Sequence, residues 1–242
     1  MRPILLLKTG ELAIANEFGP YEGLFANVLS GTELTVVDIR HEDPPHDDWA
    51  GVIITGSPAS TYDGEPWIKR AEDFLRRSAI RGTPLFGVCF GHQLLGQTFG
   101  GKVARSPNGF ELGTRDVQLT AAGQADPLLG VLPAVCPVQM THGDVVVDLP
   151  PGAVVLAENA HSPHQAFRLG ESIWGVQFHP EFSAAVERAV IEAFFVRPRL
   201  QAFPDWSGDA ETLHRSLRAE VRDTPEASCC LRRFVEWVQS QY

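Results

Sequence analysis

A cysteine with one glycine two residues before it and another two residues after it is the first group in this sequence that indicates chemistry. The pentapeptide 87–91 reads Gly-Val-Cys-Phe-Gly and places Cys89 after a short apolar run that is typical of a buried strand. A helical pattern with His92, Leu94 and Leu95 follows directly. This spacing is typical of a nucleophile elbow, in which the nucleophile tops a sharp strand-to-helix turn. A thiol there lies at the positive end of the helix dipole, which favours the nucleophilic thiolate.

The alternative for Cys89 is a buried structural thiol, because free cysteine is among the most buried residue types. For a cysteine considered alone, that interpretation is the better one. The two flanking glycines, placed between a strand and a helix, reverse the preference. They are the residues that a tight turn needs when its backbone passes close to its neighbours.

A second stretch supplies what a cysteine nucleophile requires, a base and a group that orients the base. The segment 175–182 reads Gly-Val-Gln-Phe-His-Pro-Glu-Phe and carries His179 and Glu181 two residues apart. On an extended strand two such side chains point to the same side. Pro180 cannot donate to a sheet ladder, so it indicates the end of a strand, where side chains face a cleft. We therefore expect His179 to be the base and Glu181 its orienting carboxylate.

These two motifs resemble those of the class I, triad-type glutamine amidotransferases, and the likeness spans roughly residues 4–196. The chain is most similar to the amidotransferase domain of GMP synthase and its stand-alone relatives. The resemblance implies a flavodoxin-like three-layer α/β/α fold with a mostly parallel central sheet and an antiparallel extension. We expect an amidotransferase domain at 1–198 and a C-terminal helical extension, 199–242, packed on the same domain.

The resemblance also implies an oxyanion hole beside the nucleophile. The turn that follows the expected strand at 51–55 contains Gly56 and Ser57, and the equivalent family loop supplies a main-chain N–H to the oxyanion. By this likeness the donor is near Gly56 and Ser57 and is paired with the N–H of Phe90. Such fixed donors are needed wherever negative charge develops in a tetrahedral intermediate. The family often has a second glycine in place of Ser57, a mild departure because the donor belongs to the main chain.

A further stretch, 141–145, resembles the family segment that borders the glutamine pocket, so Thr141, His142 and Gly143 are expected to line the substrate site. Their main-chain groups would hold the α-amino and α-carboxylate groups of the substrate. Gln93 matches a family position whose side chain contacts bound glutamine, and a plain glutamine at a helix N-terminus is an equally weighted alternative. His142 is the rival of His179 as base. We reject it because no carboxylate lies at a suitable spacing and the family assigns it no proton transfer.

The expected elements place these residues on an α/β sheet. Parallel strands are expected at 4–7, 34–38, 51–55 and 85–88, with helices at 20–30 and 67–80 between them. Shorter β pieces then follow at 102–104, 116–120, 135–141 and 154–158. A hairpin at 165–169 and 172–178 would bring His179 back to the elbow. Helices at 183–196, 209–222 and 225–239 complete the chain.

Composition excludes several classes of function. The formal net charge of −10 argues against nucleic-acid binding, and no basic cluster is long enough to form a binding stripe. We expect no targeting segment and no membrane span, because the apolar run at 4–7 is too short for either. The four cysteines have no zinc-type spacing, so we expect no metal, no disulfide framework and a reduced cytoplasmic location. No organic cofactor is implied.

The expected reaction is hydrolysis of the γ-carboxamide of glutamine through a γ-glutamyl thioester on Cys89. No synthetase domain is recognisable, so a separate synthetase subunit could accept the ammonia, or the chain could act alone. The first alternative activity is hydrolysis of γ-glutamyl peptides, which some stand-alone relatives carry out with the same triad. An alternative of another class is a non-catalytic regulatory module on this fold. The intact set of Cys89, His179 and Glu181 counts against that module.

Overall fold

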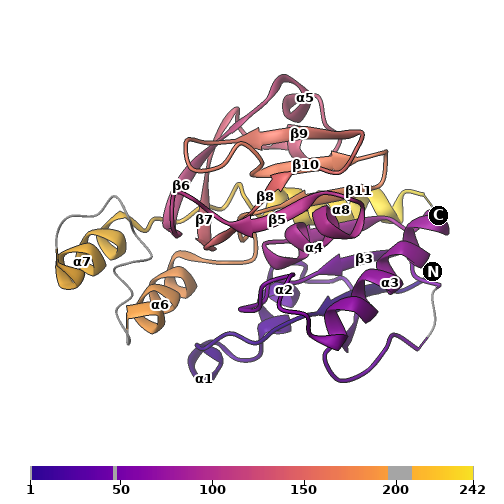
Figure 1. The fold of residues 1–242 in the computed structure, drawn as a ribbon, viewed down its shortest axis with the longest axis horizontal. Helices are drawn as coiled ribbons and strands as arrows, with labels where there is room; N and C mark the ends of the chain where they lie inside the picture. Colours follow the sequence, from indigo (N-terminus) through magenta and orange to yellow (C-terminus); the bar gives the residue numbers. More distant parts are fainter. Residues whose placement is uncertain (1, 46–47, 196–208, 242) are drawn as a thin grey trace.

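The computed structural model describes residues 2–45, 48–195 and 209–241, and its centre is one nine-stranded sheet (Figure 1). The strand order is β2-β1-β3-β4-β11-β10-β9-β6-β7. The first five of these strands run parallel: β2 (Leu34–Asp38), β1 (Ile4–Lys8), β3 (Gly51–Ile54), β4 (Leu85–Val88) and β11 (Ile173–Val176). The remaining strands pair antiparallel: β10 (Ala166–Leu169), β9 (Ala153–Glu158), β6 (Glu111–Leu119) and β7 (Val135–His142). The predicted parallel sheet with an antiparallel extension is confirmed.

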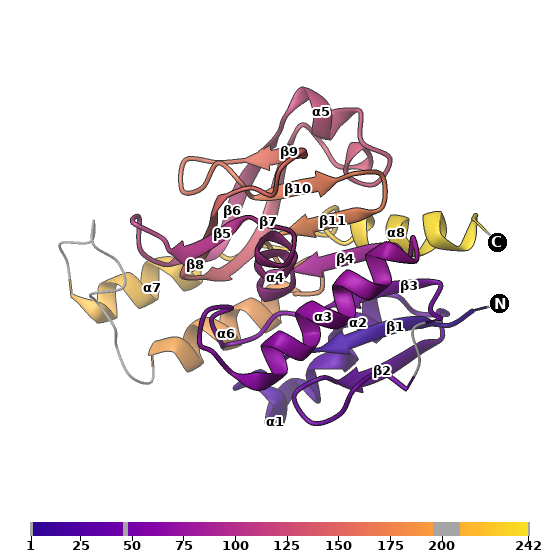
Figure 2. The same ribbon diagram turned by 45° about the vertical axis from the view of Figure 1, so that its right-hand side comes forward.

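Helices cover both faces of the parallel part, because residues that alternate along its strands are buried on opposite sides. Leu6 and Phe86 pack in a core with α2 (Tyr21–Val28) and α8 (Cys229–Gln239). Leu5 and Leu85 pack in a second core with α3 (Pro66–Ile80) and α4 (Phe90–Thr98). Figure 2 shows α3 and α4 on the near side of the sheet and α8 behind it. No helix among the described residues is long and apolar enough to cross a membrane.

Smaller elements complete the antiparallel half of the molecule. A two-stranded sheet pairs β5 (Lys102–Arg105) with β8 (Asp144–Asp148). The short helix α5 (Ala121–Gln124) begins where the Thr120 hydroxyl accepts the N–H of Gly123, and one turn of 3₁₀ helix at Leu129–Val131 follows. Another short helix, α1 (Ala15–Phe18), precedes α2. The sequence did not predict β8, because it begins only two residues after β7 ends.

The end of the chain contributes three helices. α6 (Ala184–Phe195) follows the His179 segment, and α7 (Ala210–Glu220) packs beside it at one end of the molecule (Figure 1). α8 inserts Phe234 against Phe86 and Trp174, with ring centroids 5.3 and 6.3 Å apart. The expectation for the extension 199–242 falls partly on residues 196–208, which lie outside the described ranges. Residue 196, the last residue of the helix expected at 183–196, is also outside the described ranges.

Two strand ends differ from the prediction in a way that affects the site. β6 begins at Glu111, five residues before the expected start, although Gly113 within it has a φ of 87°. A glycine with positive φ interrupts the alternation that marks a strand in sequence. β11 ends at Val176, so His179 and Glu181 lie in a turn after the strand. The prediction that an extended strand points both side chains to one side is therefore wrong.

Candidate active site

Cys89 occupies a strained turn between β4 and α4. Its φ and ψ are 51° and −103°, and it is the one non-glycine residue with positive φ among those described. Such strain persists only where the surrounding structure fixes it, and it is common at active sites. The glycines on either side permit this turn. A Cβ at Gly87 would lie 2.4 Å from the backbone of Gly91, and one at Gly91 would lie 2.5 Å from the carbonyl oxygen of Ile54.

Three neighbouring strands deliver the site residues to one edge of the sheet. Gly56, Cys89 and His179 follow the carboxyl ends of β3, β4 and β11, which lie side by side in the parallel sheet. The N–H of Cys89 donates to the carbonyl of Val176 at 2.9 Å, which fastens the elbow to β11. Parallel sheets place ligands at this edge. A Cβ at Gly56 would lie 3.1 Å from Cε1 of His179 and 3.6 Å from Cβ of Cys89, so the three residues meet.

His179 and Glu181 form a buried hydrogen-bonded pair. Nδ1 of His179 lies 2.7 Å from Oε1 of Glu181, which leaves Nε2 as the ring nitrogen for Cys89. The His179 N–H donates to the carbonyl of Gln139 on β7, and Phe182 stacks on the imidazole at 4.1 Å. Burial lowers the pKa of His179, but Glu181 and then Cys89 outweigh it and raise this pKa well above its usual value. The imidazole is thus suited to carry a proton beside a thiolate.

The oxyanion turn has one N–H group already engaged. The N–H of Gly56 donates to the hydroxyl of Tyr21 at 3.1 Å. No acceptor among the described residues is recorded for the N–H of Ser57 or of Phe90. The two predicted donors that face no protein acceptor are therefore those of Ser57 and Phe90, and Gly56 contributes by fixing the turn.

A cavity of about 510 Å³ opens beside Cys89. Its walls come from segments far apart in the sequence, and seven of the ten predicted site residues line it: Ser57, Cys89, Gln93, Thr141, His142, Gly143 and His179. Gly56, Phe90 and Glu181 are the three predicted residues that do not line it. The carbonyl of Thr141 accepts the thiol of Cys89 at 3.7 Å, which is a long contact. The lining also includes several apolar side chains, among them Leu12, Phe110, Val190 and Phe194.

His142 has a carboxylate partner, contrary to the sequence argument against it. Its Nε2 lies 2.9 Å from Oε2 of Glu111, which stands directly opposite His142 in the β6–β7 register. Burial raises the pKa of Glu111, but the hydrogen bonds from His142 and Asn159 and the charges of His142 and His161 together outweigh it, so the net pKa is lowered. The other nitrogen of His142 lies 3.1 Å from the carbonyl oxygen of Asp144. Both ring nitrogens are thus occupied, and this occupancy is the structural reason to prefer His179 as base.

Gln93 is engaged through its NH₂ group. The amide nitrogen donates to the carbonyl of Asp144 at 2.9 Å and to Oε1 of Gln177 at 3.1 Å. These bonds tie the start of α4 to β8 and to the segment after β11. Its carbonyl oxygen has no recorded partner among the described residues and is the atom that could face a ligand in the cavity.

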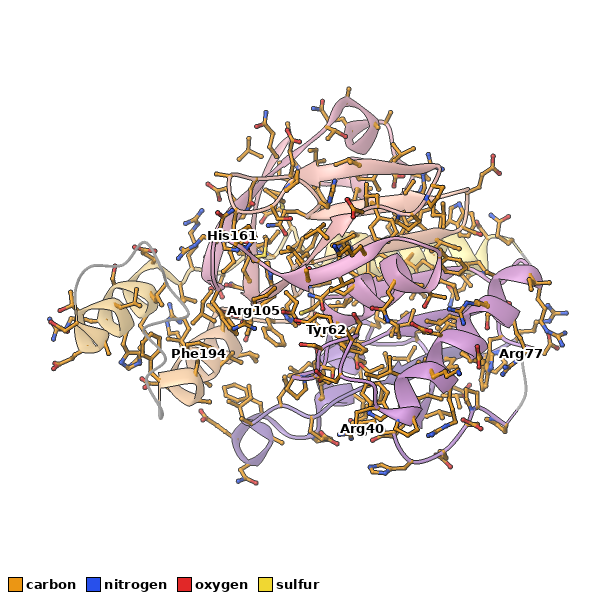
Figure 3. All side chains as sticks on the ribbon, viewed as in Figure 1. Arg40, Tyr62, Arg77, Arg105, His161 and Phe194 are labelled. Carbon is orange, nitrogen blue, oxygen red and sulfur yellow. The ribbon has the colours of Figure 1, made fainter. Side chains whose placement is uncertain are left out.

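Asp144 is a charged cavity residue that the sequence argument did not select. Its carboxylate accepts hydroxyl groups from Ser60 at 2.5 Å and Tyr62 at 2.9 Å, and Arg105 lies 3.6 Å away. Tyr62 and Arg105, both labelled in Figure 3, approach the same oxygen, Oδ1 of Asp144. The loop after the oxyanion turn is therefore fastened to β8. In the sequence, the only indication of a role for Asp144 was its position within the stretch 141–145.

Glu187 on α6 is a second carboxyl that sequence reasoning missed. It is fully buried, accepts the N–H of Gly113 at 2.9 Å, and lies 3.2 Å from the Thr141 hydroxyl. Burial raises the pKa of Glu187 to about 7. An acidic residue in the first turn of a helix is ordinarily solvated, so its type and position gave no sign of this burial.

Glu187→Gln should therefore stabilise the protein at alkaline pH. The folded-state pKa lies above the unfolded value, so ionisation begins to destabilise the fold near pH 4.5 and does so fully above pH 7. The gain in unfolding free energy should approach about 3 kcal/mol at pH 8 and vanish near pH 4. Denaturant titrations over this range test it, with Glu171→Gln in an exposed turn as control. Equal shifts at both pH values would contradict the assignment.

No cluster of three or more His, Cys, Asp or Glu side chains suited to a metal ion occurs within residues 2–45, 48–195 and 209–241. Cys89, His179 and Glu181 bring together a thiol, an imidazole and a carboxylate, which are the groups that covalent catalysis by a cysteine requires. The chemistry that these residues can support by themselves is acyl transfer through a thioester.

Comparison with known proteins identifies the family. The model of the family "Glutamine amidotransferase class-I" matches residues 25–198. The chain belongs to this family. A GMP synthase (glutamine-hydrolyzing) from Thermomicrobium roseum is 35% identical over 188 residues, which are 73% of this chain and 34% of that protein. The chain thus corresponds to about a third of that GMP synthase.

Solved structures of glutamine amidotransferases share the fold over nearly all of the chain. A glutamine amidotransferase from Methylobacillus flagellatus has a TM-score of 0.75 at 23% identity, covering 99% of this chain and 95% of its own. Another, from Thermotoga maritima, has a TM-score of 0.73 at 22% identity and covers 98% of each chain. The elbow and the His-Glu segment of this chain both lie within the part matched by the family model.

Proposed function

We propose that this protein hydrolyses the γ-amide of glutamine through a covalent γ-glutamyl thioester on Cys89. The observation that carries the proposal is the meeting of the strained Cys89 turn with the buried His179–Glu181 pair at one edge of the sheet. The 35% identity to a glutamine-hydrolyzing GMP synthase supports glutamine as the substrate. A non-catalytic regulatory module would need neither the strained backbone at Cys89 nor the buried His179–Glu181 pair.

In the proposed reaction the Cys89 thiolate attacks the γ-carbonyl carbon, and the new oxyanion accepts the N–H groups of Ser57 and Phe90. The His179 imidazolium gives its Nε2 proton to the leaving nitrogen, and ammonia departs as the thioester forms. Glu181 keeps Nδ1–H fixed throughout. Water then attacks the thioester with His179 as base, and glutamate leaves as the thiolate is restored. In this scheme Cys89, His179 and Glu181 act as a catalytic triad. The reaction needs no cofactor, and we expect the protein to act in the cytoplasm.

The oxyanion turn is held in place by hydroxyl groups. The carbonyl oxygen of Gly56 lies 3.0 Å from the hydroxyls of both Thr9 and Thr55. The Gly56–Ser57 peptide is trans, so the Ser57 N–H points away from these threonines. A turn held this way supports activity without a synthetase partner. The possible synthetase subunit remains a proposal drawn from the GMP synthase relative.

The isolated protein should therefore release ammonia from glutamine, and the double change Thr9→Val and Thr55→Val should lower kcat about tenfold or more, since two hydrogen bonds to the turn are lost. Ammonia release measured with and without a GMP-forming synthetase tests this. Thr98→Val is a matched control, because the buried Thr98 hydroxyl has no recorded partner. Strong stimulation of the unaltered protein by the synthetase would contradict an autonomous enzyme.

The size and lining of the cavity favour one second candidate, hydrolysis of a γ-glutamyl peptide or amide. The cavity of about 510 Å³ is lined in part by the apolar side chains of Phe110, Val190 and Phe194. An apolar wall contributes little to the binding of free glutamine but would bind the side chain of a larger leaving group. Release of amino acids from γ-glutamyl dipeptides, compared with ammonia from glutamine in kcat/KM, separates the two substrates.

A further inference from the structure

Tyr21 lies between the two halves of the proposed catalytic site. It begins α2, is 1% exposed, and its ring packs against Phe25 and Phe182 at 5.6 and 6.4 Å. Its hydroxyl lies 2.8 Å from Oε1 of Glu181 and 3.1 Å from the N–H of Gly56. One hydroxyl thus joins the carboxylate that orients His179 to the turn that carries the oxyanion donor.

The direction of these hydrogen bonds is fixed by their chemistry. The N–H of Gly56 can only donate, so the Tyr21 oxygen accepts it. The Tyr21 O–H then donates to Glu181, which also accepts Nδ1–H of His179 at the same oxygen. This ordered chain requires a protonated Tyr21. Burial, followed by the charges of Glu181 and Cys89, raises the pKa of Tyr21 well above its usual value, which keeps the O–H in place.

Gly56 is tightly packed against the Tyr21 hydroxyl, and both of its main-chain polar groups are hydrogen-bonded. A Cβ at Gly56 would lie 2.6 Å from the Tyr21 oxygen, so the glycine lets the tyrosine hydroxyl reach the turn. With its N–H held by Tyr21 and its carbonyl held by Thr9 and Thr55, Gly56 has both main-chain polar groups fixed. The orientation of the next N–H group, that of Ser57, is then fixed because Gly56 before it is held in place.

We propose that Tyr21 is a positioning residue that sets the oxyanion turn and the His179–Glu181 pair relative to each other. It acts through its hydrogen bonds to Gly56 and Glu181, and its side chain also lines the cavity beside Cys89. This inference rests on the proposed hydrolysis at Cys89. It predicts that loss of the hydroxyl impairs reactions that build an oxyanion more than reactions that need only the thiolate.

Tyr21→Phe tests this with two reagents that alkylate Cys89. Iodoacetamide needs only the thiolate, whereas a glutamine analogue with a chloroketone in place of its carboxamide places a developing oxyanion in the hole. The variant should react with iodoacetamide within about threefold of the unaltered protein. Chloroketone labelling, and kcat for glutamine, should fall about 10- to 100-fold with little change in KM. Val28→Ala, which alters packing on the same helix away from Tyr21, should preserve the ratio of the two labelling rates.

Equal loss with both reagents, or no loss with either, would overturn the role of Tyr21. Absence of any Cys89 labelling in the unaltered protein would instead contradict the proposed function, and the inference with it.

Hydrogen exchange tests the role of Tyr21 without any variant. The Gly56 amide, bonded to a buried hydroxyl, should exchange at least about 100-fold more slowly than the Ser57 amide. Equal exchange of the two amides would contradict the proposal even if Tyr21→Phe failed to fold.

Discussion

Replacing Cys89 with alanine should lower kcat for glutamine by about 10⁴-fold or more, because the covalent route disappears with the nucleophile. Its position in the strained turn beside His179 is not available to any of the other cysteines. Cys136 and Cys230 are buried, and burial raises the pKa of the Cys136 thiol to about 12 and that of the Cys230 thiol well above its usual value. Neither is therefore suited to form a thiolate at neutral pH.

Steady-state release of ammonia and of glutamate measures this effect. Cys229→Ala, a change to the partly exposed cysteine on α8, is the matched control and should retain activity. Cys89→Ser should also be nearly inactive, since a hydroxyl is a weaker nucleophile in a site built for a thiolate. Substantial turnover by Cys89→Ala would rule out the thioester mechanism.

The second large effect is expected for His179 and Glu181, which should behave as one unit. His179→Ala should cost about 10⁴-fold in kcat, and Glu181→Ala should cost less, since the carboxylate acts through the imidazole. Once His179 is gone, Glu181 has no imidazole to orient. The double variant should therefore resemble His179→Ala alone.

Single and double variants compared in one assay test this coupling. His41→Ala, at an exposed histidine, is the control for a general loss of a histidine. Losses that simply multiply in the double variant would contradict the proposed triad. Glu181→Gln refines the experiment, because the amide keeps the shape of the side chain while removing the charge that raises the pKa of His179.

Local patterns were enough to predict the elbow and the fold class. β4 was predicted at its observed bounds, since an apolar run ends at a glycine-flanked cysteine. The β3, β4 and β11 ends could be placed at one edge because parallel strands in such folds share it. The pairing of His179 with Glu181 was predicted for an incorrect reason, since a turn and not an extended strand brings them together.

Partners that are far apart in sequence could not be predicted. Glu111 meets His142 through the β6–β7 register, and Gly113 hid the start of β6. Tyr21 reaches Glu181 across 160 residues, and in sequence it reads as an ordinary core tyrosine of a helix. Its role depends on how α2 packs on the sheet, which tertiary contacts determine.

The most direct test of the account is to identify which cysteine a glutamine-like electrophile modifies. The protein is treated with the chloroketone analogue of glutamine at neutral pH, and the modified peptide is located by mass spectrometry. The account predicts a single adduct on Cys89, formed before any reaction at Cys136, Cys229 or Cys230 and prevented by excess glutamine. Preferential labelling of another cysteine, or labelling of Cys89 that glutamine does not protect against, would contradict it.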